Sequence, residues 1–353
     1  MRRGWLAEGW SRSEPRVSET AGAAERRVHV HIENSRRSAP VFEITPELFA
    51  ATAARHPAVG GRVDPTFGCD LDNFDVAMRT AEVLIGWRVP REDLRTRAPA
   101  LRWLHLKGAG VEHLLPLDWV PPRLVITNNS GVHAPKAGEF VTLALLMLNN
   151  AIPALMTQQR ERRWSQVFST PIAGKTLVVV GVGHMGGVAA RRAKQLGLRV
   201  LGVRRSRRPH RHVDEMHGPE DLDRILPGAD FLLVAVPLTG ATRGLIGRRQ
   251  LDLLPPHAGV INLGRARVVD YAALADKLGR GELGGAILDV FDPEPLPANS
   301  SLWSTPNLVI TPHVSSDDAM AYIPRTLDLF FDNLARYLAG RRLRNRVQVT
   351  REY

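Results

Sequence analysis

The sequence has 353 residues, of which 44% are hydrophobic and 24% charged, with a formal net charge of +11. This length favours two domains with substantial cores. The single cysteine, Cys69, excludes an internal disulfide framework, and no apolar run approaches the ~18 residues of a membrane span. The basic residues are mostly arginines spread along the chain, which favours a solvated surface over a nucleic-acid site. We therefore predict a cytoplasmic protein whose partners include neither nucleic acid nor membrane.

The first part of the chain predicts a small α/β domain. Residues 1–26 are polar and unpatterned, so we expect a disordered or loosely attached extension. Apolar residues then alternate with two histidines from Arg27, as in a half-buried strand. We expect these histidines to lie on the faces of the strand, and no metal site is predicted. Thr45 and Pro46 predict the start of a helix that runs to about His56. Further apolar runs at 82–87, 101–107 and 124–127 suggest a mostly parallel sheet.

The segment 133–156 is apolar over most of its helical surface. We expect it to be buried between domains or subunits.

A glycine turn organises the middle of the chain. The run 177–180 is apolar and β-branched, it ends in Gly181, Gly183 and Gly186, and a helix-forming segment follows. The first glycine permits the tight turn, the second permits close approach of a pyrophosphate, and the third permits packing of the helix on the strand. The helix N-terminus would add free N–H groups and a partial positive charge. This order predicts a dinucleotide-binding unit of the Rossmann type.

Later apolar runs predict further parallel strands at 229–238, 259–263, 285–290 and 308–311. An amphipathic helix is expected at 320–338, followed by a solvated basic tail, 343–353. The predicted fold is therefore α/β with two domains. Residues 132–313 would form the dinucleotide-binding Rossmann domain; residues 27–131, completed by the C-terminal helix within 314–342, would form a smaller flavodoxin-like parallel α/β substrate domain.

Three short motifs follow these strands, where ligands bind in open α/β sheets. They are Asn262-Leu263-Gly264-Arg265, the stretch DVFDPEP at 289–295, and Thr311-Pro312-His313-Val314. An arginine, a proline-rich acidic loop or a histidine alone is usually structural. Together these groups form a set that proton and anion chemistry can use.

With these motifs in this order, the chain resembles the D-isomer-specific 2-hydroxyacid dehydrogenases, of the glyoxylate/hydroxypyruvate reductase type, from about Arg27 onward. The resemblance implies NAD(P)H-dependent reduction of a small 2-oxo acid to the D-2-hydroxy acid by a homodimer. It implies a catalytic set of Arg265, Glu294 and His313. His313 would donate the proton, Glu294 would orient it and raise its pKa, and Arg265 would bind and polarise the substrate.

The stretch LKGAGVE at 106–112 resembles the family's substrate loop, whose backbone N–H groups bind the substrate carboxylate. On that mapping the donors are Ala109 and Gly110. Glu112 stands where the family usually has aspartate. Trp303 is either a substrate wall or a packed loop residue.

The cofactor is predicted from the end of the second Rossmann strand, which carries arginines and a serine in place of a carboxylate. This favours NADP(H), with NAD(H) as the alternative. We expect Asp289 to bond the nicotinamide amide. The complete predicted cofactor set is Gly181, Gly183, His184, Met185, Gly186, Arg204, Arg205, Ser206, Val236, Pro237, Thr239, Asn262, Leu263, Gly264 and Asp289.

Two alternatives stay open. The first is a nucleotide-sensing binding protein or corepressor on the same fold, which the basic surface would suit. The second is D-3-phosphoglycerate dehydrogenase, although the chain beyond the last helix has no room for the regulatory domain that many of these enzymes carry. Formate is disfavoured, because formate dehydrogenases of this superfamily have glutamine where Glu294 stands.

Overall fold

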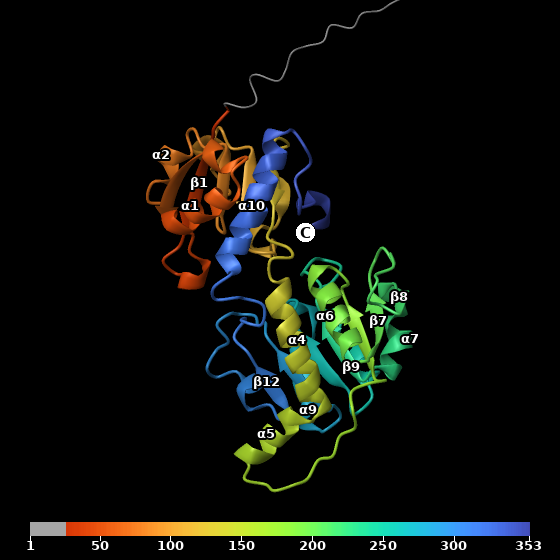
Figure 1. Cartoon of the computed structure of the whole chain (residues 1–353). Helices are drawn as coiled ribbons and strands as arrows, with labels where there is room; N and C mark the ends of the chain where they lie inside the picture. The colour runs from red at the N-terminus through yellow and green to blue at the C-terminus, as the bar shows by residue number, and fades with distance from the viewer. Residues whose placement is uncertain (1–25) are drawn as a thin grey trace, which may run out of the picture.

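A computed structural model describes residues 26–353, and Figure 1 shows that they form two α/β units joined through helix α4. The extension predicted for residues 1–26 lies outside the described residues, except for Arg26. Each unit is built on one parallel sheet, of five and seven strands respectively. The predicted α/β fold with two parallel sheets is therefore confirmed, whereas the domain boundaries at 131/132 and 313/314 stay a prediction.

The first sheet has the strand order β2-β1-β3-β4-β5, which is the flavodoxin-like order. Thr45 caps α1 as predicted, because its side chain accepts a hydrogen bond from the Leu48 N–H. Strand β2 was missed, because Pro65 and Gly68 interrupt its pattern. The elements are β1 (Val28–Asn34), α1 (Pro46–Arg55), β2 (Val63–Cys69), α2 (Phe74–Ala77), β3 (Val83–Gly86), α3 (Leu94–Arg97), β4 (Trp103–Leu106) and β5 (Val125–Thr127).

The second sheet has the order β12-β11-β10-β9-β6-β7-β8. All its strands are parallel, and the order in which they follow one another across the sheet reverses at β6, which lies between β7 and β9, as in the Rossmann fold. Strand β8 was missed because it is only three residues long. The elements are β6 (Thr176–Val180), α6 (His184–Gln195), β7 (Arg199–Val203), β8 (Glu215–His217), α7 (Leu222–Ile225), β9 (Phe231–Val234), α8 (Arg248–Asp252), β10 (Gly259–Asn262), α9 (Tyr271–Gly279), β11 (Gly285–Leu288) and β12 (Leu308–Ile310).

The apolar segment 133–156 forms two helices, α4 (Ala134–Asn149) and α5 (Ile152–Arg160). The chain breaks at Ala151, whose φ is +52°. The inner face of α4 packs on β6 and α6, but Leu143 on its outer face is 52% exposed. The predicted burial of this segment therefore holds, within this chain, only for the inner face of α4. No single helix among the described residues could cross a bilayer; α4 and α5 pass that test only as a pair bent by 66°.

Helix α10 (Tyr322–Leu338) returns to the first sheet, as expected, and covers it together with α1 (Figure 1). Phe330 is fully buried and stacks on Trp103 of β4, with ring centroids 5.1 Å apart. Burying an aromatic side chain of this size stabilises the fold by about 1.5–3 kcal/mol. The core cluster on this face of the first sheet thus depends on a helix contributed by the far end of the chain.

The basic tail, 343–353, is not a solvated segment as predicted. Leu343 and Val347 are buried, and the Val347 N–H donates to the Ile126 carbonyl at 2.9 Å. Arg346 forms an antiparallel bridge with Thr127. The tail docks because Leu343 and Val347 are spaced to face the core while its arginines face water.

Candidate active site

The glycine turn has the geometry that a dinucleotide requires. Gly181 has φ +99° and lies against the Ala235 carbonyl, and Gly186 lies against the Gly181 carbonyl so closely that a Cβ would collide with it. By contrast, a Cβ on Gly183 would meet nothing within 4 Å. No side chain caps the N-terminus of α6. The turn therefore leaves an open approach to free helix N–H groups, which fits a pyrophosphate.

Other predicted cofactor residues surround this turn. Val236 lies between Gly181 and Gly264, with its carbonyl against the latter. The hydroxyl of Thr242 ties the next loop together by accepting from the Thr239 N–H at 2.8 Å and donating to the Pro237 carbonyl at 2.6 Å. In the turn itself, His184 is exposed and its ring packs against Gly131, while Met185 is half-buried.

The end of β7 carries no carboxylate. Arg204 is half-buried, and its side chain forms no hydrogen bond or ion pair with any residue of the described chain. Ser206 is exposed. Arg205 donates to the Tyr353 hydroxyl at 2.8 Å, a contact that sequence reasoning missed. An available guanidinium and a hydroxyl suit a phosphate better than a ribose diol.

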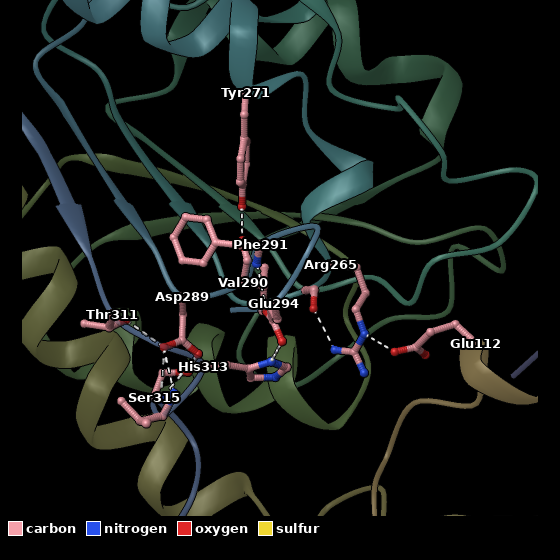
Figure 2. A network of polar contacts seen from close by, with 12 residues as sticks. Glu112, Arg265, Tyr271, Asp289, Val290, Phe291, Glu294, Thr311, His313 and Ser315 are labelled. Carbon is pink, nitrogen blue, oxygen red and sulfur yellow. Dashed lines mark hydrogen bonds and ion pairs between the residues drawn. The ribbon is translucent and has the colours of Figure 1, made fainter. Parts of the chain in front are cut away.

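His313 and Glu294 meet across two loops (Figure 2). The Nδ1 of His313 lies 2.9 Å from the Oε2 of Glu294, and the other carboxylate oxygen accepts from the Phe291 N–H at 2.8 Å. The hydrogen bond that His313 donates to the Glu294 carboxylate raises the pKa of His313 above its ordinary value, although burial opposes this. Burial works against ionisation of Glu294, but His313 and the Phe291 N–H outweigh it and lower its pKa. The pair therefore favours a protonated imidazole beside an ionised carboxylate.

His313 has φ +55°, in the left-handed region that a residue with a Cβ rarely adopts. Strained backbone of this kind persists where the surroundings fix it. Here the Asp289 carboxylate, 1% exposed, accepts from the Thr311 hydroxyl at 2.6 Å and from the Val314 and Ser315 N–H groups at 3.0 and 3.1 Å. Asp289 thus clamps the chain on both sides of the histidine (Figure 2).

Asp289 has this structural role besides the predicted one. Its Oδ2 also accepts from the Ser315 hydroxyl at 2.5 Å, so both oxygens form hydrogen bonds inside the chain. The contact of Asp289 with a nicotinamide amide stays a prediction. The signal for the structural role was present in the sequence, since Thr311 and Ser315 flank His313 with hydroxyls.

Asn262 also supports the site from within. It is fully buried, and its amide donates to the Arg265 carbonyl at 3.2 Å and to the Tyr271 hydroxyl at 2.9 Å while accepting from the Gly264 N–H at 3.0 Å. Leu263 is buried in the core. These two side chains shape the turn that carries Arg265, and the contact of Asn262 and Leu263 with a cofactor stays a prediction.

Arg265 connects the second unit to the first. Its Nε donates to Glu112 at 2.5 Å and its Nη1 to the Gly264 carbonyl at 2.7 Å. Burial of the Glu112 carboxyl opposes ionisation, but the Arg265 cation outweighs it, so the pKa of Glu112 lies below its ordinary value. Glu112 is a site residue that sequence reasoning passed over as a harmless replacement of aspartate.

The predicted substrate loop lies against the same guanidinium. A Cβ on Gly110 would lie 2.1 Å from the Arg265 Nη2, so a side chain at this position would displace the guanidinium. Within residues 26–353, the N–H groups of Ala109 and Gly110 have no hydrogen-bond acceptor. Asn128 steadies the loop by donating to the Ala109 carbonyl at 2.8 Å. Unpaired N–H groups beside a cation form a site for a carboxylate.

Trp303 lies outside this arrangement. Its indole N–H donates to the Pro297 carbonyl at 2.9 Å and its side chain is 48% exposed. The packed-loop alternative therefore describes it better than a substrate wall.

The chain is similar to known proteins. Residues 142–315 match the family model described as D-isomer specific 2-hydroxyacid dehydrogenase, NAD binding domain. A glyoxylate/hydroxypyruvate reductase B of Pectobacterium atrosepticum is 33% identical over 261 residues, which cover 70% of this chain and 81% of the relative. This chain belongs to the D-isomer-specific 2-hydroxyacid dehydrogenase family. As a member of that family it is an oxidoreductase with a nicotinamide dinucleotide cofactor.

Solved structures of the family match along nearly the whole chain. One from Xanthobacter autotrophicus Py2, in complex with NADPH and MES, is 32% identical with a TM-score of 0.79 and covers 93% of this chain and 100% of that one. An NADPH-dependent glyoxylate/hydroxypyruvate reductase from Sinorhizobium meliloti, in complex with NADP and sulfate, is 26% identical with a TM-score of 0.75, at coverages of 93% and 100%. A D-3-phosphoglycerate dehydrogenase of Mycobacterium bovis is 32% identical, but this chain spans only 54% of it.

Proposed function

We propose that this dehydrogenase uses NADP(H) to reduce a small 2-oxo acid, such as glyoxylate or hydroxypyruvate, to the D-2-hydroxy acid. The observation that carries the proposal is the grouping of the His313–Glu294 pair with Arg265 (Figure 2). These residues lie at the carboxyl ends of neighbouring strands, opposite unpaired N–H groups of the first unit. Reduction of a 2-oxo acid requires a proton donor and a cation for the ketone oxygen and a binding site for the carboxylate, and this arrangement offers all three.

His313 is the proton donor in this proposal. Its Nδ1 is engaged with Glu294, so the Nε2 is left to give its proton to the ketone oxygen. Glu294 fixes the ring and stabilises the imidazolium, which is the form needed for reduction. The Asp289 clamp holds the histidine backbone in place.

Arg265 binds and polarises the substrate. Its side chain is 26% exposed, so part of the guanidinium remains accessible beside Glu112. The substrate carboxylate would accept from the Ala109 and Gly110 N–H groups, which places the ketone toward Arg265 and His313. Negative charge grows on the ketone oxygen during reduction, and a fixed cation stabilises that charge most strongly in the transition state.

A bound NADPH supplies the hydride for the carbonyl carbon. The glycine turn and the α6 N-terminus would hold its pyrophosphate, and Arg204, Arg205 and Ser206 would hold the 2′-phosphate. The absence of a carboxylate at the end of β7 supports NADP(H) over NAD(H). Relatives crystallised with NADPH and NADP support the same choice.

We further propose a homodimer in the cytoplasm. Leu143 and Leu146 on α4 are 52% and 38% exposed, and the connection between α5 and β6 exposes Trp164 and Phe168 at 97% and 86%. Exposed aromatic and aliphatic side chains on adjoining segments are typical of a subunit interface. Sedimentation analysis should give about twice the chain mass; a monomer at micromolar concentration would contradict the dimer.

The proposed activity is tested by a panel of 2-oxo acids assayed with NADPH and NADH in parallel. We expect the highest kcat/KM with NADPH and either glyoxylate or hydroxypyruvate, and formation of the D-isomer from hydroxypyruvate. Higher activity with 3-phosphohydroxypyruvate would favour phosphoglycerate dehydrogenase instead. Tight NADPH binding without turnover of any 2-oxo acid would favour a nucleotide-sensing protein.

A further inference from the structure

The tail that docks on the first sheet continues to the cofactor edge of the second. Its anchor on the first unit is extensive: the Asn345 carbonyl accepts from the Asn128 N–H at 3.0 Å, and the Asn345 amide donates to the Ser130 carbonyl at 2.6 Å. Asn333 of α10 also holds the Arg344 N–H at 2.7 Å. The path of the following residues is therefore fixed by the first unit.

The last residues of this tail contact the second unit at two points. The Nη2 of Arg205 donates to the Tyr353 hydroxyl at 2.8 Å, and its Cζ lies 5.9 Å from the centre of the Tyr353 ring. The Gly240 N–H donates to the Glu352 carboxylate at 3.3 Å. A short 3₁₀ turn, Val349–Arg351, and a bond from the Gln348 N–H to the Tyr353 carbonyl at 2.8 Å give the segment its shape. Figure 1 shows this end of the chain in the space between the two units.

Both contact points belong to the part of a Rossmann unit that receives the adenosine half of a dinucleotide. Arg205 follows β7, the strand whose end meets the ribose 2′ position. Gly240 adjoins Thr239, in the loop after β9. The tail thus brings a tyrosine hydroxyl from the first unit to the position where the 2′-phosphate is expected.

The chemistry of the pair suits a phosphate. The tyrosine oxygen accepts from Arg205, so its own hydrogen remains available to donate. The guanidinium uses one of its five N–H groups for this bond. The ring also limits the motion of the arginine, since the cation stacks over its face. A phosphate placed beside this pair can accept from both side chains at once.

We propose that Tyr353 is a further residue of the cofactor site, which binds the adenosine 2′-phosphate jointly with Arg205 and so selects NADP(H) over NAD(H). This inference rests on the proposed function. Because the tail is anchored on the first sheet, the 2′-phosphate would contact both units.

The experiment compares Tyr353→Phe, Arg205→Ala and wild type by calorimetric titration with 2′,5′-ADP, 5′-AMP, NADPH and NADH. Tyr353→Phe removes only the hydroxyl of an exposed residue, so the fold is retained. We expect the variant to bind 2′,5′-ADP and NADPH about tenfold more weakly, as for the loss of one hydrogen bond to a charged group. Its affinity for 5′-AMP and NADH should change less than about twofold. Val349→Ala, an exposed change in the same tail, is the matched control and should bind as wild type does.

Unchanged NADPH and 2′,5′-ADP binding by Tyr353→Phe, with wild type still preferring NADPH, would overturn this inference alone. Tighter binding by the variant would also overturn it and would indicate that the tail blocks the site. Arg205→Ala should lose the preference for 2′,5′-ADP over 5′-AMP. A wild-type protein that binds no dinucleotide, or binds NADH as tightly as NADPH, would overturn the cofactor assignment of the proposed function and this inference with it.

Discussion

The Nε of Arg265 lies 2.5 Å from a carboxylate oxygen of Glu112, although the two residues follow strands of different sheets. This ion pair joins the predicted catalytic arginine to the loop that carries Ala109 and Gly110. The Glu112 side chain is 28% exposed, so the pair is neither a surface contact nor a buried core bridge. We interpret Glu112 as the residue that sets the direction of the guanidinium before a substrate binds.

Glu112→Ala should therefore lower kcat/KM for the 2-oxo acid by about 10- to 100-fold, because small misplacements of a catalytic cation are costly. NADPH affinity should stay within about twofold of wild type. Glu92→Ala, at an exposed site of the first unit, is the control. Steady-state kinetics with full activity in the Glu112 variant would show that Arg265 needs no such partner.

The pH dependence of reduction follows from the His313–Glu294 pair. The raised pKa of His313 extends to higher pH the range in which the proton donor is charged, so reduction should be constant at low pH and fall as pH rises through that pKa. Glu294→Gln removes the negative charge that favours imidazolium, so the falling limb should move to lower pH. Profiles of kcat/KM against pH for wild type and for Glu294→Gln locate the falling limb of each protein. If the limb of the variant coincides with that of wild type, or lies at higher pH, the pairing is contradicted.

Asp289→Asn distinguishes two roles of this carboxylate, which are the positioning of the segment around His313 and the predicted contact with the nicotinamide amide. Because the aspartate clamps the segment around His313, the amide should lower kcat about tenfold or more through misplacement of the imidazole, and leave NADPH binding almost unchanged. Titration with NADPH and single-turnover rates distinguish the effects. A large loss of NADPH affinity with normal chemistry would instead support the predicted contact of Asp289 with the nicotinamide amide.

Phe330→Ala tests the dependence of the first unit on α10. Phe330 is fully buried against Trp103, and replacing a buried phenylalanine with alanine costs about 3–5 kcal/mol. Urea unfolding followed by tryptophan fluorescence should show that loss. Leu329→Ala, on a half-buried position of the same helix, should cost less. Equal stability of the Phe330 variant and wild type would mean that α10 does not complete this core.

Local patterns in the sequence were sufficient for the fold. Thr45 and Pro46 start a helix, and the spacing of Gly181, Gly183 and Gly186 fits a strand, turn and helix, because these signals act within a few residues. Strand β2 was lost because Pro65 and Gly68 weaken its pattern, although pairing with β1 stabilises it in the sheet.

The site was predicted less completely, for a physical reason. The motifs place Arg265, Glu294 and His313 at strand ends, and the structure brings these three together. Partners that depend on packing between distant segments left no local signal. Glu112 reaches Arg265 across 153 positions and Arg205 reaches Tyr353 across 148. Asp289 and Asn262 were noticed, but their burial, which decides what their oxygens and amides can bind, is a property of the folded chain.

The most direct test of the central claim is the initial rate of NADPH oxidation with glyoxylate by wild type and by His313→Ala, together with NADPH affinity of both proteins. We predict steady turnover by wild type and a loss of about 10²- to 10⁴-fold in kcat for the variant, the range for a missing general acid, with NADPH affinity retained. Near-normal turnover by His313→Ala, while it binds NADPH as wild type does, would contradict the account.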